Sequence, residues 1–164
     1  MGFNLVKGIG AVRFKQILDF FGSLEIAWNS PSEGFEAAGI SPKIIENLNR
    51  VRHQVDLDVV MNNIHTRNIK VVTWDDTDYP RRLKEINQAP PVLFVNGSIN
   101  VEDDWAVAVV GTRRVTPYGR QVTVEVAHFL AQNGITVVSG LARGMEAISH
   151  HDALQAGGRN FSVV

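Results

Sequence analysis

Two short apolar runs in the second half of the chain each lead directly into a loop that contains glycine and arginine. The runs are Trp105–Val110 and Ile135–Val138, and the loops that follow them are Gly111–Arg114 and Ser139–Gly144. Strands that are apolar at every position are typical of a parallel sheet buried on both faces. Because ligands bind outside the carboxyl ends of the strands in such sheets, the pattern predicts an anion-binding crevice between the two arginine-bearing loops.

Strand and helix patterns alternate around these loops. They predict strands over 105–110, 135–138 and 160–164, and helices over 117–132 and 145–156. Thr116 and Pro117 form a helix start, and Gly134 lies just past the end of that helix. The residues expected on its buried stripe are Val122, Val126, Phe129 and Leu130. Parallel strands joined by right-handed crossover helices place the chain in the α/β class.

The last predicted strand reaches the final residue, Val164. A doubly wound sheet needs further strands and covering helices, and a bare apolar edge favours aggregation. We therefore expect the chain to be a piece of a longer protein. Its exposed edge is expected to pair with another copy or to exchange its last strand.

The first 67 residues have a helical pattern. Apolar residues recur at helical spacing in two segments: Phe14, Ile17, Leu18 and Phe21, then Ile44, Ile45 and Leu48. Gly22-Ser23 ends the first helix, Ser41-Pro42 begins the second, and a third is expected over 54–67.

Two glycine turns precede helices in this region, Gly8-Ile9-Gly10 and Gly39-Ile40-Ser41. Each resembles the turn of a helix-hairpin-helix unit, whose backbone amides can face a DNA phosphate. The alternative is that the glycines only permit tight turns between helices, since Lys7 and Lys43 are the only basic residues well placed beside them.

Between residues 68 and 104 the pattern changes to short strands and turns. Strands are expected over 69–73 and 92–95, a short helix over 80–86, and a lead into the main sheet over 101–104. Arg81, Arg82 and Lys84 form a basic cluster that we interpret as a solvated surface. The expected domains are therefore a helical one over 1–67 and a sheet-containing one over 68–164.

Composition excludes several classes of protein. The chain has no cysteine, which rules out disulfides and thiolate metal sites and fits a reducing cytoplasm. No apolar run approaches the ~20 residues of a membrane span, and the N-terminus lacks a signal-peptide pattern. A net charge of −1 argues against a generally basic DNA-coating protein, although from Trp105 onward five arginines face only three acidic residues.

The two loops have the residue types that bind phosphate. Glycine lets the backbone approach a ligand, Thr112 offers a hydroxyl, and Arg113 and Arg114 offer planar bidentate donors. The second loop contains Arg143 and leads into a helix N-terminus. Neither loop matches G-x-G-x-x-G or the Walker A motif, so the usual dinucleotide and ATP sites are not indicated. Simple turn chemistry is the alternative for both loops.

Three residues near the loops are expected to support them. We interpret His150 as the residue that orients the backbone of the Ser139–Gly144 loop. Glu146 lies one helical turn before His150, and no second cluster supplies the ligands that a metal site needs, so neither metal nor cofactor is predicted. Tyr118 is the one aromatic residue retained as a candidate ligand contact.

Several segments, taken together and in order, resemble the DprA/Smf family (DNA-processing protein A). They are Tyr79-Pro80, Leu83, Ala89–Gly97, Ala108–Arg114, Thr116–Gly119, Val137–Gly144, His150 and Ala153-Leu154. The combined order is highly specific, and the resemblance covers essentially the whole chain.

The resemblance implies both a fold and a function. Family members have a Rossmann-like parallel sheet, expected to be incomplete here, which is often preceded by a small helical SAM-like domain. They are cytoplasmic bacterial proteins, not known as enzymes, that bind single-stranded DNA during natural transformation, protect it and help load the RecA recombinase. The full-length protein is expected to form a homo-oligomer, with further DNA-contacting, dimerisation and RecA-contacting segments beyond residue 164.

By the same resemblance, Arg113 and the Ser139–Gly144 loop match positions that line the family's DNA-binding pocket. The predicted DNA-binding residues are Gly111, Thr112, Arg113, Arg114, Ser139, Gly140, Arg143 and Gly144, supported by Tyr118, Glu146 and His150.

Two departures and one alternative accompany this interpretation. The chain has Gly144-Met145-Glu146 where family members usually have Gly-Ile-Asp, and Ser149-His150 where they have Ala-His. The longer acid keeps a carboxylate but alters its reach toward the loop. The alternative function is a nucleotide hydrolase of related fold with Glu146 as its acid or base, although a second catalytic carboxylate and a Pro-Gly-Gly segment are lacking.

Overall fold

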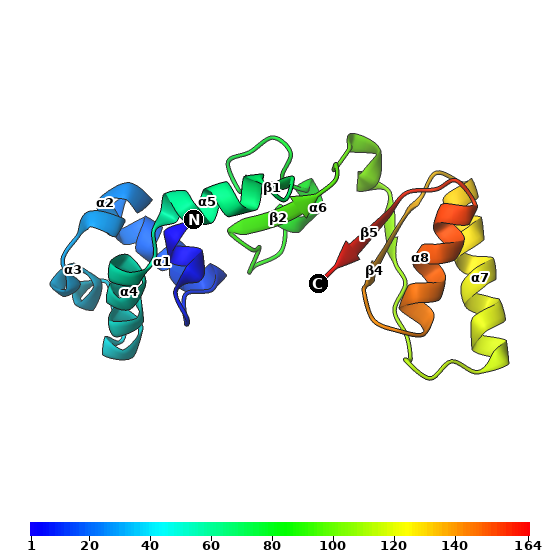
Figure 1. The fold of residues 1–164 in the computed structure, drawn as a ribbon, viewed down its shortest axis with the longest axis horizontal. Helices are drawn as coiled ribbons and strands as arrows, with labels where there is room; N and C mark the ends of the chain where they lie inside the picture. The colour runs from blue at the N-terminus through cyan, green and yellow to red at the C-terminus, as the bar shows by residue number, and fades with distance from the viewer. The chain divides into compact units, whose positions relative to one another are not determined.

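The computed structural model describes residues 1–164, which divide into two compact units, Met1–Ser98 and Ile99–Val164. The first unit contains helices and a β-hairpin, and the second contains a parallel sheet with two α-helices (Figure 1). None of the helices is both long enough and apolar enough to cross a membrane.

The first unit opens with one 3-10 helix and five α-helices. They are η1 (Gly2–Leu5), α1 (Ala11–Phe21), α2 (Leu24–Asn29), α3 (Ser32–Ala37), α4 (Pro42–Gln54) and α5 (Leu57–His65). The apolar positions predicted for α4 are all buried, as are Phe14 and Ile17 of α1. They share one core with Phe3 and Phe35.

Local sequence sets the ends of these helices. Gly22 ends α1 in the left-handed conformation (φ +70°), and the hydroxyl of Ser23 accepts hydrogen bonds from two amides at the start of α2. Ser41 and Pro42 begin α4 as predicted, although the Ser41 side chain makes no capping hydrogen bond.

The two glycine turns pack reciprocally against α4 and α1. Gly8 (φ +103°) leaves room for α4, whose Asn47 donates a hydrogen bond to the carbonyl oxygen of Lys7 at 2.9 Å. Gly39 (φ +77°) leaves room for Gln16 of α1, which donates to the carbonyl oxygen of the residue before Gly39 at 2.7 Å. These contacts explain both glycines as helix–helix turns, and a DNA contact at either turn stays a prediction.

A two-stranded antiparallel hairpin follows. Its strands are β1 (Ile69–Thr73) and β2 (Val92–Asn96), and the connection between them contains the short helix α6 (Arg81–Lys84). Both strands agree with the predicted ones to within a residue. The helix is shorter than predicted because the chain continues into turns after Glu85.

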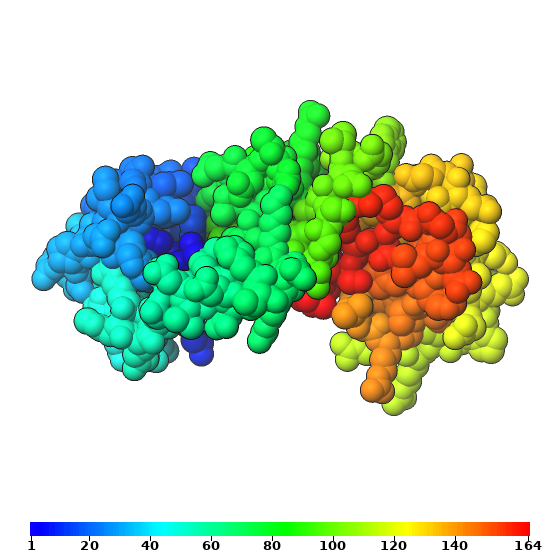
Figure 2. Space-filling view, turned by 45° about the horizontal axis from the view of Figure 1, so that its top comes forward, coloured from blue at the N-terminus to red at the C-terminus, as the bar shows by residue number.

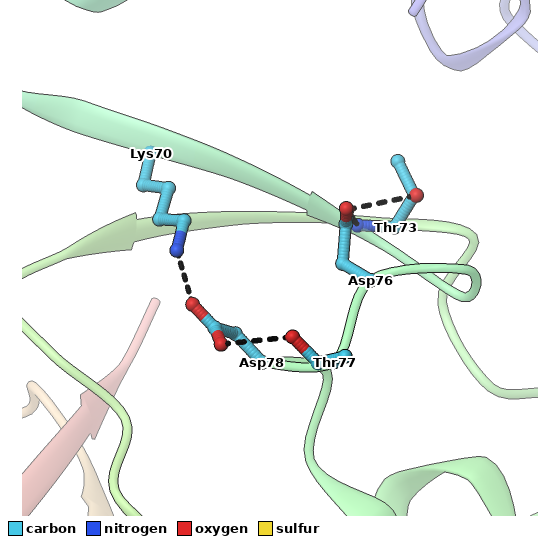
Figure 3. Close-up of polar contacts among 5 residues, drawn as sticks. All are labelled: Lys70, Thr73, Asp76, Thr77 and Asp78. Carbon is cyan, nitrogen blue, oxygen red and sulfur yellow. Dashed lines mark hydrogen bonds and ion pairs between the residues drawn. The ribbon is translucent and has the colours of Figure 1, made fainter.

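Two aspartates hold the connection next to β1 (Figure 3). Asp76 accepts hydrogen bonds from the amide of Thr73 at 2.7 Å and from its hydroxyl at 2.9 Å. Asp78 pairs with Lys70 and accepts a hydrogen bond from the hydroxyl of Thr77 at 3.4 Å. The bonds from Thr73 lower the pKa of Asp76, and the bond from Lys70 lowers the pKa of Asp78.

Two aromatic residues fix the connection of the hairpin, one within the connection itself and one against the helices. The hydroxyl of Tyr79 donates to the carbonyl oxygen of Pro90 at 2.7 Å, and burial raises the pKa of that hydroxyl. Trp74 packs edge-on against Phe14 of α1, with ring centroids 5.4 Å apart. The hairpin therefore groups with the helices, and the two compact units divide after Ser98, whereas the sequence pattern changes character after residue 67.

The second unit is a three-stranded parallel sheet in the order β3-β4-β5. Its elements are η2 (Val101–Asp104), β3 (Ala106–Ala108), α7 (Pro117–Gln132), β4 (Thr136–Gly140), α8 (Met145–Gln155) and β5 (Asn160–Val163). The bounds of α7 are those predicted, and the hydroxyl of Thr116 caps it by accepting from the amide of Gly119 at 3.1 Å. The predicted strand over 105–110 is shorter, because the chain leaves the sheet after Val109, and the segment 101–104 is a 3-10 helix.

The helices α7 and α8 lie on the same face of this sheet (Figure 1). Successive right-handed crossovers between neighbouring strands place their helices on one side. Leu130, Ala131, Val137 and Ala153 form the core between helices and sheet. The expectation of a sheet buried on both faces was therefore wrong for this structure, since Trp105 is 72% and Val107 40% exposed.

The buried face of α7 also differs from the predicted stripe. Of the predicted residues only Leu130 is buried, whereas Val126 and Phe129 are exposed. The other buried positions of α7 are Thr123, Ala127 and Ala131. Apolar residues occur on two faces of this helix, and the small side chains face inward because they allow α8 and the turn at Gly158 to approach closely.

Asp103 joins the amino ends of β4 and β5 to the segment before β3. It accepts hydrogen bonds from the hydroxyl of Thr136 at 2.7 Å, from Nε and Nη2 of Arg159 at 2.7 and 2.8 Å, and from the amide of Asn100 at 2.7 Å. Burial by itself raises the pKa of Asp103, but the bonds from Arg159, Asn100 and Thr136 outweigh it and the pKa is lowered.

Candidate functional site

The two predicted loops contact each other beyond the carboxyl ends of β3 and β4. The amide of Met145 donates to the carbonyl oxygen of Thr112 at 3.2 Å. Gly144 has φ +90°, and a Cβ on it would lie 2.5 Å from that oxygen and 2.7 Å from Cα of Arg113. Only glycine fits such a position. The loops, yellow-green and orange in the space-filling view, reach the surface at the same end of the unit (Figure 2).

The first loop is a tight turn that leaves its arginines free. The hydroxyl of Thr112 accepts a hydrogen bond from the amide of Arg114 at 3.1 Å. Gly111 lies against the side chain of Met145 with no space for a Cβ. Arg113 and Arg114 are both exposed, and neither guanidinium makes an ion pair or a hydrogen bond within the chain.

The second loop is fixed by its own polar groups. The hydroxyl of Ser139, which is buried, donates to the carbonyl oxygen of Val109 at 2.5 Å. The amide of Ala142 donates to Oε2 of Glu146 at 2.9 Å. Ser139 and Glu146 therefore hold the loop, whereas Arg143 is exposed and its guanidinium makes no ion pair or hydrogen bond within the chain.

His150 reaches back from α8 to the same loop. Its Nε2 lies 2.8 Å from the carbonyl oxygen of Gly140 and 3.3 Å from the hydroxyl of Ser162 in β5. The imidazole is buried, and its Nδ1 has no hydrogen-bond partner. The bond to Gly140 is the contact that an orienting role for His150 requires.

Tyr118 stands on the first turn of α7, directly after the first loop. Its side chain is 77% exposed, and its hydroxyl makes no hydrogen bond within the chain. An exposed ring beside cationic side chains is the arrangement on which a nucleic-acid base can stack.

The site has more cationic side chains than acidic ones. Four arginines near the loops have no acidic partner: Arg113, Arg114, Arg120 and Arg143. The carboxylate of Glu146, on the first turn of α8, accepts a hydrogen bond from an amide of the second loop. The amides of Ala142 and Met145 are already hydrogen-bonded, whereas the guanidinium groups of these arginines are available as donors to an anion.

One feature of the site follows from the structure and not from the sequence. Met145 links the loops, its amide to Thr112 and its side chain to Gly111, although its place directly after Gly144 was the only signal of such a role. No group of three or more His, Asp or Glu side chains is placed to hold a metal ion.

Comparisons with known proteins found a matching family and similar chains. The model of the family described as DNA recombination-mediator protein A matches residues 70–164. The protein Smf of Synechocystis sp. is 34% identical over 169 residues, which are 100% of this chain and 42% of that protein. The DNA processing protein DprA of Bacillus subtilis is 34% identical over 97 residues, 58% of this chain and 33% of that protein.

A solved structure has the same fold. The chain superposes on the X-ray structure of DNA processing protein A from Streptococcus pneumoniae with a TM-score of 0.76 and 23% identity, covering 99% of this chain and 55% of that one. The chain thus spans less than half the length of the two relatives compared by sequence.

Proposed function

This chain belongs to the DNA recombination-mediator protein A family, as its resemblance to DprA/Smf proteins predicted, and we propose that it binds single-stranded DNA through its two arginine-bearing loops. The residues proposed for this site are the eight predicted from the sequence, with Tyr118, Glu146 and His150 in supporting roles. The names of its relatives support a role in processing DNA.

The observation that carries the proposal is the state of the arginines. Arg113, Arg114 and Arg143 come from two touching loops, are exposed, and have no acidic partner in the chain. Leaving several guanidinium groups unpaired at one end of a sheet costs electrostatic repulsion, which a polyanion relieves. Guanidinium groups bind phosphate bidentately, and phosphate contacts position a nucleic acid without reading its sequence.

Single-stranded DNA fits this surface better than a duplex does. Its bases are unpaired and can stack on an exposed ring such as that of Tyr118, whereas the bases of a duplex are stacked on one another. The proposed complex therefore combines phosphates on the arginines with one base on Tyr118.

The wider role is proposed for a full-length protein of this family. In that proposal it is a cytoplasmic recombination mediator that acts in natural transformation, protects incoming single strands, helps load RecA and works as a homo-oligomer. The description of its family as a recombination mediator supports this role.

Fluorescence anisotropy of a labelled single-stranded oligonucleotide tests the proposal directly. If about three phosphates are neutralised, log K should fall against log[salt] with a slope near −2, from roughly −0.7 per phosphate. Arg113→Ala should weaken binding and make the salt dependence less steep. Tyr118→Ala should weaken binding and leave the salt dependence unchanged. Arg67→Ala, an exposed arginine of the first unit, is the control and should bind like the parent. A slope near zero, or equal loss in the control, would refute the proposal.

We assign binding and not catalysis to the site. Glu146, the acid or base of the alternative hydrolase, already accepts a hydrogen bond from the loop that it would have to serve. Incubation with nucleoside monophosphates should therefore release neither base nor phosphate. Release that disappears in Glu146→Gln would favour the hydrolase.

A further inference from the structure

Glu146 holds the second loop from inside. It is the second residue of α8, and its Oε2 accepts a hydrogen bond from the amide of Ala142 at 2.9 Å. The same oxygen lies where a Cβ on Gly140 would be only 2.6 Å away. The loop therefore closes around this carboxylate, and it does so because residue 140 has no side chain.

A second hold comes from the same helix one turn later. Nε2 of His150 lies 2.8 Å from the carbonyl oxygen of Gly140. Residues four apart lie on the same helix face, so Glu146 and His150 hold the loop on either side of Leu141. The Leu141 side chain, by contrast, is exposed, as is that of Arg143, which directly follows the residue that Glu146 holds.

The start of α8 also contacts the backbone of the first loop. The amide of Met145 binds the carbonyl oxygen of Thr112, and the backbone at Arg113 lies against Gly144. The separation of Arg113 and Arg143 is thus set by one helix end, provided that the second loop does not move on it.

The charge of Glu146 and its hydrogen bond have opposite effects on the affinity of the site for an anion. A carboxylate near arginines lowers their attraction for phosphate, so removing it should tighten binding if charge dominates. A loop that loses its internal hydrogen bond has to be ordered when the ligand binds, so removing it should weaken binding if positioning dominates. The two effects therefore differ in sign.

We propose that Glu146 is a positioning residue for the DNA site, which acts through the Ser139–Gly144 loop on Arg143 by its hydrogen bond to Ala142. This inference rests on the proposed function. Glu146→Ala should bind a labelled oligothymidylate about tenfold more weakly, the factor expected from ordering one further residue on binding. Glu146→Gln keeps an acceptor oxygen at the same reach and should restore most of the affinity.

The matched control is Glu125→Gln. Glu125 is an exposed residue of α7 whose carboxylate accepts a hydrogen bond from the side chain of Gln121. Loss of its charge should leave DNA binding unchanged or slightly tighter. If Glu146→Ala and Glu146→Gln both bind as tightly as the parent or more tightly, the proposal is overturned.

A measurement without DNA separates this inference from the proposed function. By NMR hydrogen exchange, the amide of Ala142 should be protected in the parent chain and should exchange faster in Glu146→Ala. An Ala142 amide that exchanges as fast as a solvent-exposed one in the parent would overturn the inference whether or not DNA binds. Conversely, a protected amide in a chain that binds no DNA would contradict the proposed function and leave the hold on the loop intact. Because this arm uses the parent chain, it also stands if a variant fails to fold.

Discussion

The guanidinium of Arg159 donates two parallel hydrogen bonds to the carboxylate of Asp103, at 2.7 and 2.8 Å, across a sequence separation of 56 residues. The Asp103 side chain is 2% exposed and that of Arg159 40%, so the charge pair lies at the rim of the sheet and not in its centre. The remaining acceptor capacity of the carboxylate is taken by Thr136 and by the amide of Asn100. The amino ends of neighbouring strands are thus locked together by a single acid.

Replacing that acid should unfold the second unit more easily. Asp103→Ala removes the carboxylate that accepts hydrogen bonds from the guanidinium of Arg159 and the hydroxyl of Thr136, and we expect a loss of about 3 kcal/mol in the free energy of unfolding. Urea denaturation followed by circular dichroism measures it. Asp104→Ala, at a neighbouring position without such bonds, should lose less than about 0.5 kcal/mol. Equal losses in both variants would contradict the assignment.

The same carboxylate predicts how stability depends on pH. The pKa of Asp103 is lower in the folded chain than its ordinary value of about 3.9, so the folded state binds this proton less readily than the unfolded state does. Its contribution is complete above that ordinary value and is lost as the pH falls through the lower, folded value. The urea midpoint of the second unit should therefore drop on acidification below about pH 4, and the drop should shrink in Asp103→Asn. An unchanged acid profile in that variant would refute the prediction.

Gly144→Ala should separate the two loops. The substitution places a methyl group 2.5 Å from the carbonyl oxygen of Thr112 at φ +90°, and we expect about 3 kcal/mol of destabilisation together with loss of oligonucleotide binding. Thermal unfolding and anisotropy measure the two effects. Gly157→Ala is the matched control, because Gly157 has φ +78° but nothing within 4 Å, and it should cost only about 1 kcal/mol with binding unchanged.

Arg52→Lys should destabilise the first unit. The guanidinium of Arg52 donates to the carbonyl oxygens of Ser30 at 3.0 Å and Ala27 at 2.9 Å, and it stacks over the ring of Phe35. An ammonium group cannot reproduce this planar fork, so we expect a loss of about 2 kcal/mol in urea denaturation. Arg50→Lys, which keeps an exposed charge beside Glu46, should change stability by less than about 0.5 kcal/mol. If the two variants lose the same free energy of unfolding, the paired hydrogen bonds of the Arg52 guanidinium do not account for its contribution to stability.

Elements defined by local signals could be predicted from the sequence. The start of α7 follows from Thr116-Pro117 and its end from Gly134, and both lie where they were predicted. The parallel sheet with its crossover helices was confirmed for the same reason, since apolar runs and glycine stops are adjacent in the chain. The buried face of α7 was not predictable in this way, because Ala127 and Val126 are both apolar and only packing against α8 decides between them.

The site was predictable only in part. Motif order located the two loops, and strand order brought them together. Which groups remain available to a ligand depends on contacts that spacing does not show, such as the bond of Ser139 to Val109 and of Ala142 to Glu146. The Asp103–Arg159 pair was missed altogether, because its partners are distant in sequence and neither belongs to a motif.

The contact between Gly140 and Glu146 limits the order in which this sequence can evolve. As long as a glutamate stands at 146, a methyl group at 140 would lie 2.6 Å from its Oε2, so the end of the Glu146 side chain would have to move away from the amide of Ala142. Shortening the acid at 146 opens that space, so a side chain at 140 then fits without this displacement, and a glutamate restored at 146 would meet that side chain. Change at the two positions is therefore coupled, since the effect of a substitution at one depends on the residue at the other.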